Sequence, residues 1–129
     1  MPARERVEQL IALVEQGRFV EAIERFYAED ASMQENGAAP RRGKPALLEH
    51  ERNFLASLKS ARTLPVEDFL VDGERAVVRW RFEFTWPDGR TARLDELALQ
   101  RWRGDLIAEE RFYYDPAQMR PHDSSGEPA

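Results

Sequence analysis

The sequence of 129 residues contains no cysteine. Disulfide bonds, thiolate metal sites and cysteine nucleophiles are therefore excluded. Histidine is scarce as well, because His50 and His122 are the only two, and a histidine-rich metal site cannot be built from them. The sequence also lacks a glycine-rich phosphate loop, a serine nucleophile elbow and a zinc signature, which argues against nucleotide-dependent and acyl-enzyme chemistry.

Long apolar runs are missing too. No run approaches the roughly 18 residues that a membrane-spanning helix needs, and residues 1–5 carry charges without an apolar leader segment. The formal net charge is −5, and the 19 basic residues are dispersed among acidic ones, so no electrostatic footprint for nucleic acid is present. We expect a cytoplasmic protein that binds neither nucleic acid nor membrane.

The clearest positive signal is an alternation of apolar and polar side chains over residues 74–86, which read ERAVVRWRFEFTW. This period of two predicts a long strand with one buried face. Pro87-Asp88-Gly89 then predicts a tight hairpin, followed by a second strand that ends at Gly104-Asp105 and a third that ends near residue 116. The back half of the chain is therefore predicted to be an antiparallel sheet.

The front half is predicted to be helical, because apolar residues recur there at helical spacing. The predicted elements are helices at 4–16, 19–27 and 45–60, a short strand at 31–36, a loop at 37–43, and a strand at 62–71 that Pro65 restricts to an edge or bulged position. We predict the α+β class, with three helices packed in the concave face of a curved, mostly antiparallel sheet that forms a cone-shaped barrel. Residues 1–118 would be one domain and residues 119–129 a disordered tail.

Acidic side chains are the candidates for chemistry inside this cone. On the second long strand, Glu96 and Gln100 share a face with Trp102, whose size favours the inward side. The last strand permits two registers, one with Glu110 pointing inward and one with Glu109 and Arg111 pointing inward, and we take Glu110 as inward.

Two further carboxylates are predicted to reach the same space. Glu35 lies on one strand face with Met33, and Glu51 falls within the apolar stripe of the third helix, with His50 on its flank. Carboxyls gathered in an apolar cavity repel one another and lose hydration, which raises pKa values toward neutrality and suits general acid or base catalysis. A surface role for each acid, paired with a nearby arginine, is the alternative.

Aromatic residues supply the expected walls. Tyr27 and Tyr114 offer hydroxyl donors beside apolar surface, and Trp80 offers a flat face for a ring-shaped ligand. A magnesium or calcium site made only of Glu35, Glu96 and Glu110 would lack a ligand-dense loop. We therefore expect neither a metal nor another cofactor.

Four segments resemble the SnoaL-like branch of the nuclear transport factor 2 superfamily: RFYAEDASMQEN at 25–36, RGKPAL at 42–47, DELALQRW at 95–102 and LIAEERFYYDP at 106–116. The resemblance covers roughly residues 5–118. It implies the helix-and-curved-sheet cone, a homodimer, and activities that range from ketosteroid isomerase and polyketide cyclase to non-catalytic ligand binding.

The resemblance also implies positions for catalytic groups. Ala98 stands where ketosteroid isomerases have a proton-donating aspartate, and Glu110, Arg111 or Phe112 stands where polyketide cyclases have theirs, depending on a one-residue alignment choice. Neither activity transfers intact.

Our first hypothesis is a cofactor-free isomerase, cyclase, dehydratase or hydrolase acting on a small apolar or ring-shaped molecule. Glu110 or Glu96 would remove a proton next to a carbonyl, assisted by Tyr27, Gln100 and Glu35. The alternative is a non-catalytic ligand-binding or dimerisation module of the same fold. For the homodimer, the outer sheet face offers these residues: Arg79, Arg81, Glu83, Asp95, Leu97 and Leu99.

Overall fold

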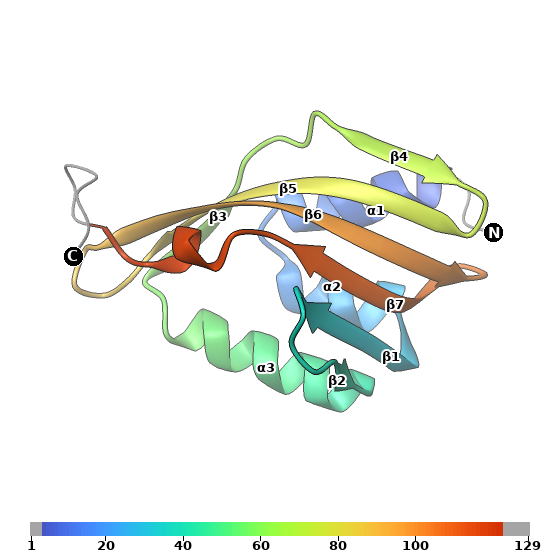
Figure 1. The fold of residues 1–129 in the computed structure, drawn as a ribbon, viewed down its shortest axis with the longest axis horizontal. Helices are drawn as coiled ribbons and strands as arrows, with labels where there is room; N and C mark the ends of the chain where they lie inside the picture. The colour runs from blue at the N-terminus through green and yellow to red at the C-terminus, as the bar shows by residue number, and fades with distance from the viewer. Residues whose placement is uncertain (1–3, 123–129) are drawn as a thin grey trace.

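The computed structural model describes residues 4–122, which form one curved sheet with helices in its concave side (Figure 1). The helices are α1 (Arg4–Glu15), α2 (Phe19–Phe26) and α3 (Lys44–Ala56), and a 3₁₀ turn, η1, spans Pro116–Met119. Apolar residues of α1 recur at three- and four-residue spacing and are buried, from Val7 to Val14. Gly17 ends α1 with φ +78°, a conformation that glycine adopts without strain.

The sheet has seven strands within the described residues: β1 (Tyr27–Glu35), β2 (Arg41–Arg42), β3 (Ser60–Thr63), β4 (Phe69–Asp72), β5 (Arg75–Thr85), β6 (Thr91–Arg103) and β7 (Leu106–Tyr113). Their order is β2-β1-β7-β6-β5-β3, with β4 also paired to β5. Only β1 and β7 run parallel; the other pairs are antiparallel. The predicted α+β class and the curved sheet are confirmed, although the sheet stays open rather than closing into a barrel.

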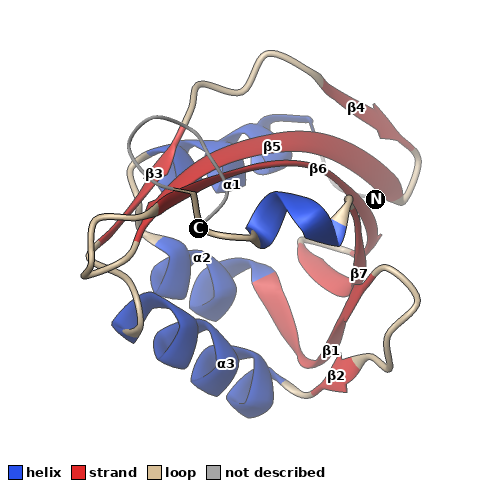
Figure 2. Cartoon of the chain, turned by 60° about the vertical axis from the view of Figure 1, so that its left-hand side comes forward, coloured by secondary structure: helices blue, strands red, loops and turns tan. Residues whose placement is uncertain are grey.

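The two long strands β5 and β6 carry the curvature, as Figure 2 shows from the side. They pair without interruption from Arg75↔Arg101 to Thr85↔Thr91, and their inward residues are buried in strict alternation on β6. The predicted hairpin at Pro87-Asp88-Gly89 joins them, with Gly89 at φ +90°. The concave faces of both strands therefore point at the helices.

Several predicted boundaries were wrong. β1 begins at Tyr27 rather than at residue 31, because Tyr27 already has an extended backbone (φ −111°, ψ 142°) where α2 ends. The third helix ends at Ala56 rather than at residue 60, and the predicted loop at 37–43 contains β2.

The single predicted strand at 62–71 is two strands, β3 and β4, that both pair with β5. Pro65 lies in the break, where it has no N–H to donate and its carbonyl accepts from Arg81 Nη2 at 2.7 Å. The prediction that Pro65 occupies an edge position is consistent with this break.

A bulge in β7 decides the register that the sequence left open. Arg101 pairs with Glu109 and Trp102 with Ile107, so Ala108 is the extra residue. Ile107 and Ala108 are consequently both buried, Leu106 is exposed, and Glu110 points inward. Unbroken alternation along β7 would place Leu106 on the inward face with Glu110, and the extra residue is the reason that it lies outside.

The predicted tail at 119–129 lies mostly outside the described residues. Of its first residues, His122 exchanges two backbone hydrogen bonds with Thr91, at 2.6 and 2.7 Å. No helix of the described part is long and apolar enough to cross a membrane.

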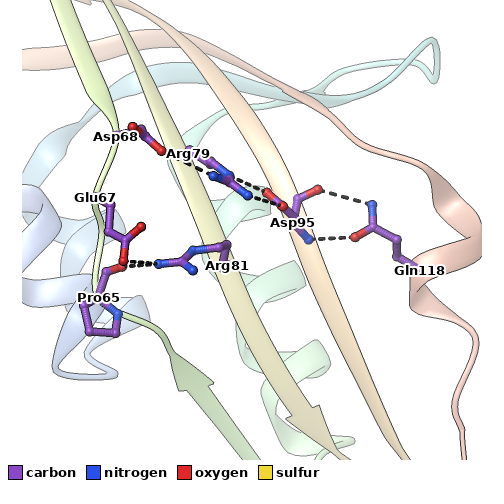
Figure 3. Close-up of polar contacts among 7 residues, drawn as sticks. All are labelled: Pro65, Glu67, Asp68, Arg79, Arg81, Asp95 and Gln118. Carbon is purple, nitrogen blue, oxygen red and sulfur yellow. Dashed lines mark hydrogen bonds and ion pairs between the residues drawn. The ribbon is translucent and has the colours of Figure 1, made fainter. Parts of the chain in front are cut away.

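Ion pairs fasten the outer face of the sheet (Figure 3). The guanidinium of Arg79 donates to both carboxylate oxygens of Asp95, at 3.0 and 2.7 Å, and to Asp68 at 3.3 Å. Gln118 of η1 exchanges hydrogen bonds with the backbone of Asp95. These contacts connect the segment before β4, β5, β6 and η1 on the side away from the helices.

We expect Leu47→Ala to lower the free energy of unfolding by about 2–4 kcal/mol, the usual cost of a large-to-small change in a core. Leu47 is the one residue of α3 that is fully buried, at 1% exposure. Leu70→Ala is the matched control, because Leu70 is 72% exposed and its loss should cost under about 0.5 kcal/mol. Urea unfolding of the two variants measures the difference, and equal losses would contradict this account of how α3 is held.

Candidate functional site

A cavity of about 180 Å³ lies between the helices and the concave face of the sheet. Its walls are apolar and aromatic, and four carboxyl groups from four different elements reach it. An engineered protein cavity of about 150 Å³ accepts benzene, so this space suits a ligand of about one ring. The residues that line it include Tyr27, Glu35, Arg41, Glu51, Trp80, Glu96 and Glu110.

Glu110 is the most enclosed of the four acids, at 3% exposure. One carboxylate oxygen accepts a hydrogen bond from the Tyr27 hydroxyl, and the other accepts from Gln100 Nε2 at 2.8 Å. The fold brings these groups together because Gln100 and Glu110 are directly paired across β6 and β7. Tyr27 arrives from the junction of α2 and β1.

A second residue orients the amide of Gln100. The indole Nε1 of Trp102 donates to Gln100 Oε1 at 3.0 Å, and both residues are fully buried. Residues two apart on a strand project from the same face, which allows this contact. The three groups form one chain of hydrogen bonds that ends on Glu110.

Burial raises the pKa of Glu110 to about 7, and the charge of Glu51 adds to this effect, while the hydrogen bonds from Tyr27 and Gln100 oppose it. The pKa of the Tyr27 phenol is raised well above its usual value, first by burial and then by the neighbouring Glu110 charge. Tyr27 therefore stays a proton donor at neutral pH, while Glu110 exchanges its proton in that range.

Glu96 differs from Glu110 in having no hydrogen bond to another residue of the described chain. It is 7% exposed and lines the cavity directly opposite Trp80 in the β5–β6 register. Burial raises the pKa of Glu96 to about 8, and repulsion by Glu110, Glu35 and Glu51 adds to the shift. At pH 7 this carboxyl is mainly protonated and can donate its proton into the cavity.

Charged residues gather where the cavity reaches solvent. Arg41 Nη2 donates to Glu35 at 3.2 Å, and both side chains are a little over one-third exposed. Burial and the charge of Glu35 raise the pKa of Glu51, whereas Arg41 lowers it. Burial and the positive charge of Arg41 lower the pKa of His50, which lies exposed at the same mouth.

Most of the residues predicted from the sequence lie at this cavity: Tyr27, Glu35, Glu51, Trp80, Glu96 and Glu110 all line it. Gln100 lies behind Glu110 rather than on the wall, and Tyr114 is half-buried but outside the lining. Ligand contact by these two residues stays a prediction. Gln100 is turned toward Glu110, and Tyr114 lies near enough to the cavity acids for burial and the charges of Glu35 and Glu96 to raise its pKa.

Arg41 was not predicted as a site residue, because residues 37–43 were expected to form a loop. The signal for Arg41 was weak, because a two-residue strand is recognisable only through its pairing with Met33 of β1. Within residues 4–122 no group of three or more metal-ligating side chains could hold a metal ion.

The perturbed acids predict an unusual pH dependence of stability. The pKa of Glu96 in the folded protein, about 8, lies above its usual value near 4.5. Between those pH values the folded state binds more protons than the unfolded state, so stability falls as pH rises through the window. Each unit of pKa difference is worth about 1.4 kcal/mol, so the total loss is expected to reach a few kcal/mol.

We therefore expect Glu96→Gln to become more stable than the wild type as pH increases from 5 to 8.5. Urea unfolding over this range measures the effect. Glu109→Gln is the control, because Glu109 lies outside on the same strand as Glu110 and Arg101 lowers its pKa by donating a hydrogen bond. Parallel pH curves for the wild type and Glu96→Gln would contradict the buried, protonated Glu96.

Comparison with known proteins identifies the family. Residues 7–110 match the family model described as the SnoaL-like domain. A comparison with curated proteins gives no match. Among solved structures, a Mesorhizobium loti protein provisionally named a SnoaL-like polyketide cyclase is 27% identical, with a TM-score of 0.75 over 88% of this chain and 100% of that one.

Two further structures share the fold at lower identity. TerC, co-crystallised with polyporic acid, is 21% identical, with a TM-score of 0.73 over 88% of this chain and 91% of its own. A Catenulispora acidiphila protein with a ketosteroid isomerase-like fold, in complex with trimethylamine, is 16% identical, with a TM-score of 0.75 over 90% of this chain and 89% of its own. Because the family model covers most of the chain, from the first helix to Glu110 on the last strand, this protein belongs to the SnoaL-like domain family.

Proposed function

We propose that this protein is a cofactor-free enzyme that moves a proton on a small carbonyl compound held in the cone. Glu110 is the general base, and Glu96 is the acid that donates a hydrogen bond to the carbonyl oxygen as negative charge develops there. The observation that carries this assignment is the contrast between two buried carboxyls on one cavity. Glu110 is held by two donors, whereas Glu96 has no partner within the described chain.

The division of roles follows from the surroundings of each acid. Hydrogen bonds from Tyr27 and Gln100 stabilise the carboxylate form of Glu110, the form that accepts a proton. The pKa of Glu96, raised to about 8 by burial and by neighbouring acids, favours its protonated form. Neighbouring carboxyls with environments that separate their roles are a recurrent arrangement in acid–base enzymes.

The cavity supports a substrate with a flat apolar body. Trp80 stands beside Glu96 across the β5–β6 pair, and Phe82 stacks near it at a centroid distance of 6.0 Å. The provisional polyketide cyclase from Mesorhizobium loti and the co-crystal of TerC with polyporic acid agree with a ligand-binding cone. These similarities support the class of site and leave the identity of the substrate to experiment.

One observation favours the alternative, a ligand-binding module without turnover. Both oxygens of Glu110 already accept hydrogen bonds within the protein, as a purely structural carboxylate would require. In that case Glu110 would hold Tyr27 and the cavity wall in place, and the ligand would be released unchanged.

Exchange of carbon-bound hydrogen separates the two possibilities. We expect the wild type to catalyse deuterium incorporation next to the carbonyl in a panel of single-ring aromatic ketones and cyclic diketones in D₂O, followed by mass spectrometry. Glu110→Gln should lower that rate by about 10²-fold or more, the usual contribution of a general base. Glu96→Gln should lower the rate by a smaller factor, because the amide of the glutamine still donates a hydrogen bond.

Glu109→Gln is the matched control for this assay, because it makes the same chemical change one residue away on the outer face. It should keep the wild-type rate. If compounds bind and yet none exchanges faster than in buffer, the binding-module alternative replaces the catalytic proposal.

We further propose that the chain forms a homodimer through the outer face of the sheet. Three of the predicted residues form ion pairs within the chain instead (Figure 3). Arg79 pairs with Asp68 and Asp95, and Arg81 pairs with Glu67. An apolar pair remains: Leu97 and Tyr113 face each other across β6 and β7 and are 47% and 43% exposed.

We expect Leu97→Arg to shift the protein from dimer to monomer, because a charge would then have to be buried in the contact. Light scattering coupled to size exclusion measures the mass, with Leu70→Arg as a control on β4, where the replaced leucine is more exposed, at 72%. A wild-type mass of one chain at micromolar concentration would remove the dimer proposal.

A further inference from the structure

Trp102 is completely buried and does not line the cavity, yet its indole N–H ends the chain of hydrogen bonds that reaches Glu110. Its backbone N–H donates to the carbonyl of Glu74 at 2.7 Å, and the β7 bulge lies beside it. The backbone of Trp102 is therefore anchored in the sheet, and its ring is enclosed by the core. Packing alone requires no N–H donor, so the contact of the indole with Gln100 requires its own explanation.

We propose that Trp102 is a positioning residue that keeps Glu110 in its proton-accepting form by fixing which end of the Gln100 amide faces it. An indole can only donate a hydrogen bond, so it must meet the carbonyl oxygen of Gln100. The amide nitrogen of Gln100 is then directed at Glu110.

The consequence is a penalty on the protonated form of Glu110. A proton on the oxygen that faces Gln100 would confront another donor, because turning the amide over would set its NH₂ group against the indole N–H. A proton on the other oxygen would reverse the hydrogen bond with the Tyr27 hydroxyl, which would then accept, and a neutral hydrogen bond would replace a stronger charge-assisted one. Both contacts therefore favour the carboxylate, and Trp102 enforces one of them at a distance.

Replacing Trp102 with phenylalanine would release the amide. Gln100 could then present its carbonyl oxygen to a protonated Glu110, which would stabilise the form that the wild type disfavours. The other ionisable groups facing Glu110 stay where they are: Tyr27 at the start of β1, Glu96 on β6 and Glu51 on α3, with Glu35 and Arg41 acting at the mouth. A change in titration would therefore report on the amide.

The experiment is a carboxyl titration by NMR of the ligand-free protein with ¹³C-labelled glutamate side chains. The Glu110 signal is identified by its loss in Glu110→Gln. We expect Trp102→Phe to raise the titration midpoint of Glu110 by on the order of one pH unit. Trp86→Phe is the matched control, because Trp86 follows β5 at the hairpin and lies outside this chain of hydrogen bonds, so the midpoint should not move. An unchanged midpoint in folded Trp102→Phe overturns the proposal.

If Trp102→Phe does not fold, the wild type alone decides. The sequence has three tryptophans, so the indole N–H signal of Trp102 is readily assigned in a ¹⁵N spectrum. We expect that signal to shift with the midpoint of Glu110, because Gln100 transmits the change in charge. An indole signal that stays constant through that midpoint overturns the proposal.

This proposal rests on the proposed function in one respect only, namely that Glu110 acts as the general base. The titrations use no substrate, so a coupled titration without hydrogen exchange would reject catalysis and retain the role of Trp102. Hydrogen-exchange activity together with an unchanged Glu110 titration midpoint in Trp102→Phe would support catalysis and reject the role of Trp102.

Discussion

The hydrogen bonds that hold the Glu110 carboxylate inside the cone are the interaction on which the rest of the site depends. A carboxylate loses most of its hydration at 3% exposure, and such a group persists only where donors replace the water. Tyr27 and Gln100 supply those donors from β1 and β6, on either side of β7. The parallel β1–β7 pair and the antiparallel β6–β7 pair are therefore both needed to assemble one residue's surroundings.

The two faces of the sheet differ in how their charged residues are arranged. On the outer face, Arg79, Asp95 and Asp68 pair in water, where such contacts each contribute little and serve to align the strands. Among the described residues that line the cavity, the acids outnumber the one arginine, Arg41, and Glu96 has no hydrogen-bond partner. Apolar residues at such positions would cost less free energy, and the proposed catalytic role would explain why carboxyls stand there instead.

Much of the architecture could be predicted from the sequence, because it depends on local patterns of apolar and turn-forming residues. The alternation at Val78, Trp80 and Phe84 identified β5, and the turn at Gly89 identified the hairpin that pairs it with β6. The boundaries near Tyr27 and Ala56 could not be predicted equally well. Helix ends are weakly encoded by local sequence. Tyr27 is extended where it pairs with Ile107 of β7, a contact that no local pattern contains.

The sequence by itself determined which residue types were available: acids in place of cysteine or histidine ligands, aromatic strands, and the inward face shared by Glu96, Gln100 and Trp102. Only the tertiary structure decided how they meet. The extra residue Ala108 turns Glu110 inward, and the pairing of β6 with β7 sets it opposite Gln100. The physical reason is that side-chain alternation is a property of one strand, whereas a bulge and a cross-strand hydrogen bond depend on two segments whose alignment no single segment encodes.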